Sequence, residues 1–324
     1  MSEPPDEFEW IKSLAPLTRG DRRALGLADD AAVIPSRPGF DLVISKDAMV
    51  GGVHTLVGET PGVIARRLLR TSLSDLAAKA AEPFGYLLMT AWPADHDRDW
   101  QAAFAEGLAD DGALYRVALL GGDTVATAGP LVVSATVLGW VRRGRMVKRS
   151  TARTGDLLMV CGAIGDGWLG LKAAKGEIAD PDGSLAGHYR LPTPLLSLRA
   201  ALDSHVRAAA DVSDGLLADA AHVAEASGLG VLIDVGAMPI SPRAASWLSA
   251  QKDDAAARLI LASGGDDYAL ACAVDPKLEG EFAEAVRAAG VLVATAGRFT
   301  SDTDIQVVRG DRPMNPLRGG WRHR

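Results

Sequence analysis

The stretch LLMVCGAIGDGWLGLKAAK, residues 157–175, decides the fold class. Its first part, Leu157–Cys161, is a short, continuous apolar run that predicts a buried strand. The Gly-rich turn Gly162–Gly167 then leads into Gly167–Lys175, whose composition favours a helix. The turn does not match the dinucleotide-binding motif G-x-G-x-x-G. It is therefore only a weak signal of dinucleotide binding and could be an ordinary turn between a strand and a helix.

The alternation of short apolar strands with helices extends in both directions along the chain. Further strands are predicted at Leu42–Ser45, Leu87–Trp92, Val117–Leu120, Leu131–Val141, Gly230–Val235 and Leu270–Val274. Further helices are predicted at Thr60–Ala81, Asp97–Gly112, Pro194–Ser204, Gly215–Ser227, Pro242–Ala250 and Pro276–Ala289. Pro61 suits a first helical turn and Gly228 a helix C-cap. The mixture predicts an α/β or α+β architecture.

Length and charge limit the possible classes of protein. The chain has 324 residues, which favours two domains. It carries 34 basic and 41 acidic residues, a net charge of −7, so a non-specific nucleic-acid partner is not expected. The apolar content of 48% supports a sizeable core. The longest apolar run, Leu131–Val141, is too short to span a bilayer, which needs ~20 residues, so no membrane partner is expected either.

The cellular setting is predicted from the N-terminus and the cysteines. The first ten residues, MSEPPDEFEW, are acidic and have no apolar core of a secretion signal. Cys161 and Cys272 both lie in apolar surroundings and are interpreted as buried free thiols. We therefore expect a cytoplasmic protein.

A basic, turn-rich segment, Arg142–Gly155, separates two halves of similar length. We place the domain boundary there, with domains at residues 1–149 and 150–324. The basic side chains favour either a solvated linker or an anion-binding role, and both interpretations stay open. The polar, Gly-rich segment Gly176–Leu191 is predicted to be a loop.

Carboxylates recur in short Gly-, Ser- and Thr-flanked turns at the ends of apolar runs. They are Asp29, Asp30, Asp47, Asp75, Asp123, Asp211, Asp214, Asp266 and Asp267. Each alone is typical of a helix cap or turn. If folding brings several together, they must protonate, stay in water or hold cations, since two carboxylates ~4 Å apart repel by ~4 kcal/mol. Oxygen ligands without a His/Cys pair favour Mg²⁺, Mn²⁺ or Ca²⁺. The pattern suggests a metal-assisted nucleotide phosphate site.

Other chemistries lack their signatures in this sequence. No P-loop, G-x-S-x-G, H-E-x-x-H or kinase H-R-D motif is present. His54 lies in a predicted loop, where most histidines are surface residues. Trp321 lies near the C-terminus, where a tryptophan usually anchors the tail but can also stack on a heterocycle.

The ordered string of motifs resembles the thiamine-monophosphate kinase family, within the aminoimidazole-ribonucleotide-synthetase-like superfamily of ATP-binding proteins. The matching pieces are ADDAAVI (28–34), SKDAMVGGVH (45–54), SLSDLAAKAAEP (72–83), GGDT (121–124), VSATVLG (133–139), KRSTARTGD (148–156), DVSDGLLADAAHVAEASG (211–228), GGDDYAL (264–270) and GW (320–321). They cover nearly the whole chain. The C-terminal tryptophan, Trp321, and the histidine that ends the second of these motifs, His54, favour this family over its relatives.

The resemblance implies an N-terminal mixed-sheet domain that forms a homodimer and a larger C-terminal α/β domain. ATP and several Mg²⁺ ions would lie in a cleft between the domains. The implied reaction transfers the γ-phosphoryl group of ATP to thiamine monophosphate, giving thiamine diphosphate and ADP. Whether a monovalent cation is also needed stays open.

The resemblance also implies roles for individual residues. Positions matching the metal site are Asp30, Ser45, Lys46, Asp47, Asp75, Asp123, Asp211 and Asp214. Nucleotide contacts match at Gly122, Asp123, Arg149 and Ser213, and thiamine phosphate contacts match at His54, Asp266 and Trp321. No residue is expected to act as a general base, and Arg149 would meet phosphate charge.

Four positions depart from the family pattern. Lys46 stands where threonine is usual, so its ammonium would replace one cation or meet phosphate. Gly51 replaces a usual glutamate, and Thr55 replaces a usual phenylalanine. Asp266 replaces a usual glutamate and reaches one methylene less far.

Two rival functions are weighed. The first is a different enzyme of the same superfamily, such as a selenophosphate synthetase or an aminoimidazole ribonucleotide synthetase. A selenophosphate synthetase would normally carry an N-terminal cysteine or selenocysteine, whereas the first cysteine here is Cys161, inside a predicted strand. A non-catalytic scaffold that binds nucleotide and divalent cations would bind ATP without turnover. An assay of ADP release with and without thiamine monophosphate separates the kinase from the scaffold.

Overall fold

The computed structural model describes residues 7–315. The chain divides into two compact units. The first runs to Leu76 and includes Ala81–Gly144, and the second takes Ala77–Ala80 and everything from Arg145 onward. The division between Gly144 and Arg145 falls inside the basic, turn-rich segment.

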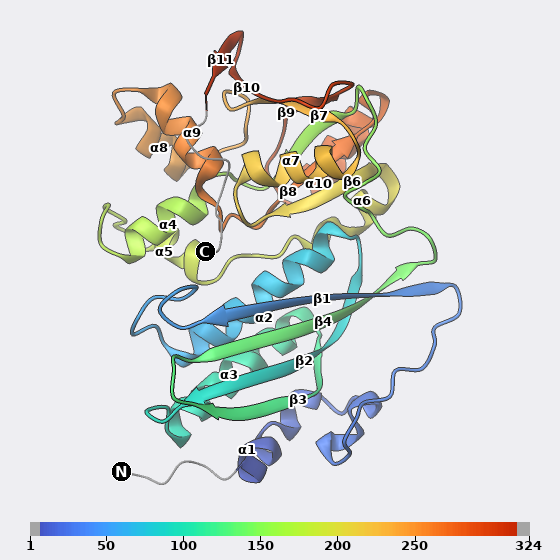
Figure 1. The fold of residues 1–324 in the computed structure, drawn as a ribbon, viewed down its shortest axis with the longest axis vertical. Coiled ribbons are helices and arrows are strands. Elements are labelled where there is room, and N and C mark those ends of the chain that lie inside the picture. The colour runs from blue at the N-terminus through green and yellow to red at the C-terminus, as the bar shows by residue number, and fades with distance from the viewer. Residues whose placement is uncertain (1–6, 316–324) are drawn as a thin grey trace. The chain divides into compact units, whose positions relative to one another are not determined.

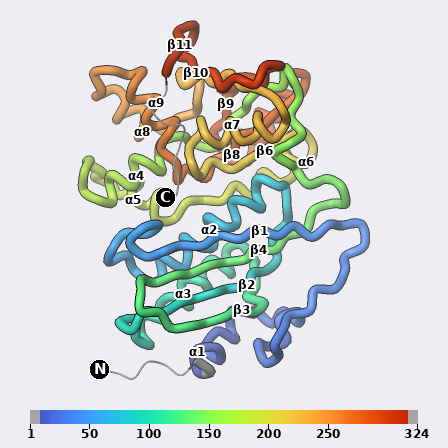
Figure 2. The backbone as a smooth tube through the Cα atoms, viewed as in Figure 1, coloured from blue at the N-terminus to red at the C-terminus, as the bar shows by residue number. Residues whose placement is uncertain are grey.

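The first unit is a four-stranded sheet with two long helices on one face (Figure 1), while the short helical segment around Ala24 packs with Leu138 and Trp140 on part of the other face. Its elements are α1 (Glu7–Ser13), η1 (Ala15–Thr18), η2 (Arg22–Leu27), β1 (Phe40–Val50), α2 (Pro61–Ala78), β2 (Glu82–Pro93), α3 (Arg98–Tyr115), β3 (Ala118–Thr127) and β4 (Val132–Arg142). The strand order is β1-β4-β2-β3, and only the β2–β3 pair is parallel. The long helix α3 makes the crossover that a parallel pair requires. Figure 2 traces how β1 and β4 lie side by side although about 80 residues separate them in the sequence.

Alternating side chains on β1 divide between the two faces of this sheet. Val43 and Met49 are buried, whereas Leu42 and Ile44 are exposed. Helices α2 and α3 cover one face of the sheet (Figure 1). Val43 lies on this face, because it alternates in step with Ser45, whose Oγ donates a hydrogen bond to Asp75 of α2. The apolar stripe of α2, with Leu68 fully buried, packs there. Period-two alternation on a strand places residues i and i+2 on one face, so the face opposite the helices carries Leu42 and Ile44.

The second unit is built on a seven-stranded, mostly antiparallel sheet of order β11-β10-β7-β9-β5-β8-β6. Its strands are β5 (Leu157–Cys161), β6 (Val206–Val212), β7 (Gly230–Asp234), β8 (Ala269–Val274), β9 (Val293–Thr300), β10 (Ile305–Arg309) and β11 (Arg312–Met314). Its helices are α4 (Asp166–Ala174), α5 (Ser184–Arg190), η3 (Leu196–Leu198), α6 (Arg199–His205), α7 (Leu216–Ala226), α8 (Pro242–Ser249), α9 (Asp254–Gly264), η4 (Pro276–Leu278) and α10 (Glu279–Ala288). Only β7 and β10 pair in parallel.

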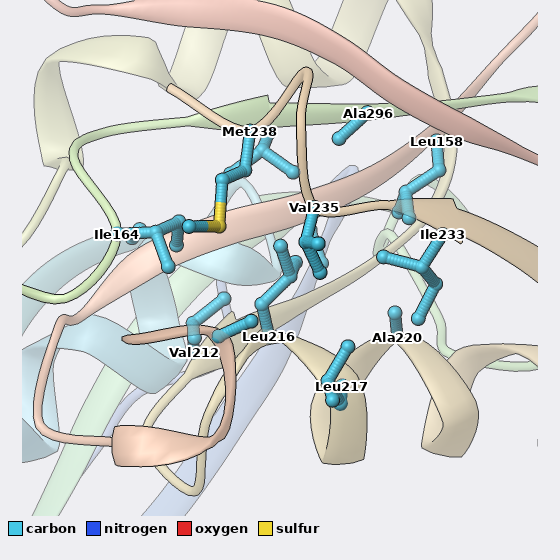
Figure 3. Close-up of a cluster of buried hydrophobic side chains, with 14 of the residues drawn as sticks. Leu158, Ile164, Val212, Leu216, Leu217, Ala220, Ile233, Val235, Met238 and Ala296 are labelled. Carbon is cyan, nitrogen blue, oxygen red and sulfur yellow. The ribbon is translucent and has the colours of Figure 1, made fainter. Parts of the chain in front are cut away.

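Helices cover both faces of this second sheet, which explains why β5 is apolar without interruption. Leu158 and Val160 pack with α4, α7, α8 and α9, whereas Met159 and Cys161 pack with α6 and α10. A strand buried on both faces has no need of polar alternation. Figure 3 shows part of the first of these clusters, with Leu216 beside Val235 and Met238.

The predicted strands and helices are confirmed in type. Pro61 begins α2, and Gly228 follows α7 with a φ of 68°. The prediction of a loop over Gly176–Leu191 is wrong in part, because Ser184–Arg190 forms α5. Leu185 and Tyr189 of α5 are buried, and this tertiary packing outweighs the polar composition of the segment.

The structure also places the two cysteines and shows the length and character of the helices. Cys161 and Cys272 are free and buried on neighbouring strands, as predicted. Within residues 7–315, no helix has both the length and the apolar character needed to cross a bilayer.

Candidate functional site

In the first unit the structure brings two of the predicted metal-site carboxylates together. Asp47 lies on β1 and Asp75 on α2, the helix that covers this face of the sheet. Ser45, two residues before Asp47, donates a hydrogen bond from Oγ to Asp75 Oδ2 at 2.5 Å. Because Ser45 and Asp47 share one face of β1, both face α2.

The electrostatics of Asp47 show that this pair is under repulsion. Burial, and to a smaller extent the negative charge of Asp75, raise the pKa of Asp47 from 3.8 to about 6 against the opposing effect of a hydrogen bond with Ser72. A half-buried carboxylate beside another carboxylate has one of two outcomes: it takes a proton or it binds a cation. The donor set therefore fits a hard divalent ion.

Lys46 lies on the opposite face of β1 from Ser45 and Asp47. It pairs with Thr136 of β4 in an unbroken register, and its Nζ lies 3.5 Å from Thr136 Oγ1. The side chain is exposed on the face where Ile44 also lies. Its ammonium therefore points away from the carboxylate pair.

Asp123 and Gly122 lie on β3, next to β2. Asp123 is exposed, and its Oδ1 accepts the backbone N–H of Thr124 at 3.0 Å. A Cβ at Gly122 would lie only 1.8 Å from the carbonyl oxygen of Leu88, so the strands approach too closely there for any side chain. This absence of a side chain leaves backbone exposed beside Asp123.

The other predicted residues of the first unit are Asp30 and His54. Asp30 is exposed in the segment that follows η2. His54 folds back on the end of β1, where its Nδ1 accepts the backbone N–H of Val50 at 3.0 Å. This hydrogen bond makes Nε2 the protonated nitrogen of the neutral ring.

No group of three or more His, Cys, Asp or Glu side chains in the described part of the chain is close enough to hold a metal ion. The structure therefore assembles a pair of carboxylates, Asp47 and Asp75. Asp30 and Asp123 are placed on other segments of the same unit.

In the second unit, Asp211, Ser213 and Asp214 lie at the end of β6 and in the turn before α7. Asp211 is buried, and Ser213 and Asp214 are half-buried. The backbone N–H of Asp214 donates to Oδ2 of Asp219, a buried residue in the first turn of α7, at 3.0 Å. Asp219 thus fixes the turn that carries the predicted ligands.

Arg149 lies on the exposed segment that precedes β5. Its carbonyl oxygen accepts a hydrogen bond from Ser227 Oγ at 3.0 Å, which ties this segment to the end of α7. His222 of α7 has a pKa raised chiefly by its hydrogen bond with Asp219, and the positive charge of Arg149 acts in the opposite direction. Arg149 therefore lies on the same side of the second unit as α7.

Asp266 lies in the turn between α9 and β8, and this turn is joined to the one that carries Ser213. The backbone N–H of Asp266 donates to the Ser213 carbonyl at 2.8 Å, and Tyr268 Oη donates to Asp266 Oδ1 at 3.1 Å. Its neighbour Asp267 is buried, and burial raises the pKa of that carboxyl well above its usual range, against hydrogen bonds from Gly165 and Gly167. Trp321 lies outside the described residues.

Sequence reasoning missed the roles of Asp219 and Asp267. Both are buried carboxylates that accept backbone N–H groups of turns next to predicted site residues. Asp267 was visible only as the second member of a carboxylate doublet, and Asp219 as an acidic residue in the first turn of a helix. Neither pattern distinguishes a buried anchor from a solvated cap.

The comparisons with known proteins agree with this arrangement of two units. The family model "AIR synthase related protein, N-terminal domain" matches residues 28–141, and its C-terminal counterpart matches residues 153–310. The chain therefore is a two-domain protein of the AIR synthase related class.

Relatives within that class narrow the assignment. The chain is 55% identical over 321 residues to the thiamine-monophosphate kinase of Caulobacter vibrioides, covering 99% of this chain and 91% of the relative. The crystal structure of the thiamine-monophosphate kinase from Stenotrophomonas maltophilia K279a matches with a TM-score of 0.82 and 32% identity, covering 93% and 96% of the two chains. This chain belongs to the thiamine-monophosphate kinase family.

A third match shows the shared fold alone, because its sequence identity is low. The structure described as "AaThiL complexed with AMPPCP and TMP" has a TM-score of 0.77 at 23% identity, and the match covers 98% of this chain and 96% of that one.

Proposed function

We propose that this protein transfers the γ-phosphoryl group of ATP to thiamine monophosphate and releases thiamine diphosphate and ADP. The observation that carries the proposal is the 55% identity to a thiamine-monophosphate kinase over almost the entire chain. The buried carboxylate pair on β1 and α2 supports it, because phosphoryl transfer needs charge neutralisation more than proton transfer.

The acceptor in this reaction is an oxygen of a phosphate monoester, which is largely deprotonated near neutral pH. It forms a bond to the γ-phosphorus while the bond to the bridging oxygen of ADP breaks. No general base is needed to create such a nucleophile. The obstacle is the repulsion between two polyanions, so the protein acts by positioning them and by offsetting their charge.

We propose that Asp47 and Asp75 hold magnesium together with Ser45, which lies on the same face of β1. Asp30, Asp123, Asp211 and Asp214 are candidate ligands of further ions. The register of the sheet places Asp123 on the opposite face from Asp47, so we do not assign it to the same ion. Magnesium, when bound, supplies Lewis-acid stabilisation and a template for the phosphates. The donor chemistry fits, since oxygen ligands alone are present and Asp47 is held beside Asp75. The Lys46 side chain projects from the opposite face of β1, 3.5 Å from Thr136 Oγ1, so we propose no contact between its ammonium and this pair.

The remaining candidates contact the two substrates. Arg149 offers phosphate a planar fork of N–H donors. Gly122 and Ser213 offer backbone and hydroxyl groups to the nucleotide. His54, Asp266 and Trp321 would contact thiamine phosphate, and the orientation of His54 makes its Nε2 a donor that suits an anion.

A coupled assay of ADP release, run with and without thiamine monophosphate, tests the function. We expect ADP to appear only when ATP, magnesium and thiamine monophosphate are all present, and EDTA to stop it. The thiamine diphosphate formed should match the ADP released mole for mole. Binding of ATP without acceptor-dependent ADP release would instead identify a non-catalytic scaffold.

We further propose that the protein is a homodimer that pairs through the sheet face of the first unit opposite α2 and α3. Leu42, Ile44 and Leu87 are 38%, 58% and 38% exposed there, and the register of β1, β4 and β2 places them on one face. Val125 of β3 extends the patch at 45% exposure. Exposed apolar side chains gathered on one face of a sheet are typical of interaction surfaces.

Sedimentation velocity tests the dimer. We expect the wild type to sediment as a dimer and Ile44→Asp to sediment as a monomer, because the charge would be buried without a partner. The matched control is Leu114→Asp, which changes an exposed leucine of α3 in the same unit and should leave the dimer intact. A monomeric wild type, or an Ile44→Asp dimer, would contradict the proposed interface.

A further inference from the structure

Three turns of the second unit meet around the start of β8. They are residues 162–165 before α4, residues 213–215 before α7, and residues 265–268 before β8. Sheet register brings them together, because Leu270 pairs with Cys161 on β5 and Ala269 pairs with Val212 on β6. The β8 turn therefore lies between the other two.

Asp267 attaches the β8 turn to the α4 turn. It is 3% exposed, and its Oδ1 accepts the backbone N–H groups of Gly165 at 3.0 Å and Gly167 at 2.8 Å. These N–H groups belong to the first turn of α4, where backbone donors have no partner within the helix and a negative charge is favoured. A carboxylate buried this deeply is retained only where it is well hydrogen-bonded.

The α4 turn also limits where Asp266 can lie. A Cβ at Gly167 would fall 2.3 Å from the carbonyl carbon and oxygen of Asp266, so the two backbones are in direct contact there. On the other side, the N–H groups of Asp266 and Tyr268 donate to the carbonyls of Ser213 and Val212, both at 2.8 Å. The backbone of Asp266 is thus held from two directions.

The local backbone of the turn is strained. Asp266 and Tyr268 have φ angles of 62° and 50°, values that residues with a side chain seldom adopt, and least of all bulky ones. This conformation directs the Asp267 side chain into the protein interior, while Asp266 stays half-buried and is hydrogen-bonded by Tyr268 Oη at 3.1 Å. Strain of this kind persists only where the surrounding structure enforces it.

We propose that Asp267 and Tyr268 are positioning residues for the Asp266 carboxylate. Asp267 fixes the backbone of the turn against α4, and Tyr268 fixes the carboxylate itself. The inference rests on the proposed function for the role of Asp266 as a contact of thiamine phosphate. Neither positioning residue touches the substrate, so each acts through Asp266.

Tyr268→Phe is the sharper test, because it removes one hydroxyl group and leaves the ring that fills the space. We expect the KM for thiamine monophosphate to rise about 5- to 20-fold, as for a lost hydrogen bond to a charged group. The KM for ATP should stay within about twofold, and the melting temperature should be unchanged. In an Asp266→Ala background the Tyr268→Phe change should have no further effect, because coupled residues are not additive.

Asp267→Asn tests the anchor at constant side-chain volume. In the wild type, Oδ2 of Asp267 also accepts the Gly165 N–H, at 2.9 Å. Asparagine keeps Oδ1 as an acceptor but replaces Oδ2 with an NH2 donor that faces this N–H, so we expect an increase in the KM for thiamine monophosphate of about 10-fold or more. The matched control is Asp156→Asn. Asp156 is equally buried, accepts the Arg153 N–H at 2.8 Å and pairs with Arg207, yet lies in another turn. Asp156→Asn should lower the stability of the protein without changing the KM for thiamine monophosphate.

Backbone hydrogen exchange gives a readout that does not depend on turnover. We expect Asp267→Asn, but not Asp156→Asn, to accelerate exchange at residues 165–167 and 266–268. If Tyr268→Phe and Asp267→Asn have normal KM values and Asp267→Asn has unchanged exchange in an active enzyme, the positioning inference is overturned and the proposed function stands. Additive effects of Tyr268→Phe and Asp266→Ala would also overturn it. A wild type without acceptor-dependent ADP release would contradict the proposed function, and the exchange data would still decide whether Asp267 holds the turn.

Discussion

Replacing Asp47 with asparagine is expected to lower kcat at least ~100-fold and to make the magnesium-free protein more stable at pH 8. The two effects have one cause. Burial and the charge of Asp75 raise the pKa of Asp47 to about 6, so the ionised carboxylate is disfavoured in the folded protein until a cation offsets it. Asparagine keeps the shape and removes the charge, and with the charge it removes the proposed ligand.

The sign of the pH dependence follows from the direction of the shift. The folded-state pKa of Asp47 is raised above its ordinary value of 3.8, so its protonated form stabilises the fold. That stabilisation is fully present below the unfolded pKa and is lost as the pH rises through about 6. Relative to wild type, Asp47→Asn should gain on the order of 1–2 kcal/mol at pH 8 and nothing near pH 4.

Chemical denaturation in EDTA at both pH values measures this difference, and added magnesium should stabilise only the wild type. The control is Asp110→Asn, which changes an exposed aspartate of α3 and should alter neither activity nor stability. A destabilised Asp47→Asn protein, or one that keeps wild-type kcat, would refute the role assigned to this carboxylate.

The fold class and most of the elements were predictable because hydrophobic pattern and end signals agree. In β5 the continuous apolar run reflects burial on both faces, and at α2 the proline at the first position marks the start. β6 was not predicted, because its sequence VRAAADV is rich in alanine, which favours helix, and only its position beside β8 makes it a strand. Helix α9 was also missed, although Asp253 caps it with a hydrogen bond to the N–H of Ala256 at 3.0 Å.

The candidate site was predictable as a set of residue types but not as a geometry. The resemblance of the motifs identified Asp47 and Asp75 as candidates. Their proximity depends on how α2 packs against β1, which the motifs do not specify. Lys46 shows the converse case. Its place in the motif suggests a metal-site role, whereas strand alternation puts its side chain on the other face of the sheet. A single sequence does not specify which segments that are distant in sequence come into contact in the fold.

Gly122→Ala is the second change for which a large effect is expected, on stability and on nucleotide binding together. β2 and β3 pair in parallel with Gly122 opposite Leu88. A Cβ at Gly122 would lie 1.8 Å from the Leu88 carbonyl oxygen and 2.8 Å from its carbonyl carbon. Both are backbone atoms, so no side-chain rotation can relieve the clash, and the strands must separate.

Separation of the strands breaks ladder hydrogen bonds between β2 and the edge strand β3 and moves the adjacent Asp123. We expect a loss of roughly 3 kcal/mol or more in the free energy of unfolding. A loss of that size lowers the melting temperature by about 6–12 °C in a domain of this size. The Kd for ATP should rise in the fraction that remains folded, because the proposed nucleotide contact is the backbone at this point.

Gly121→Ala is the matched control, one residue away on the same strand. The nearest atom to a Cβ there is Leu87 Cδ2 at 3.5 Å, an ordinary contact with the end of a flexible side chain. Its cost should stay below about 1 kcal/mol, and ATP binding should be retained. Equal melting temperatures for the two variants would mean that the β2–β3 approach at Gly122 is not the constraint, and that glycine is needed there only for contact with the nucleotide. The difference between neighbouring glycines thus separates a requirement of the sheet from a requirement of the ligand.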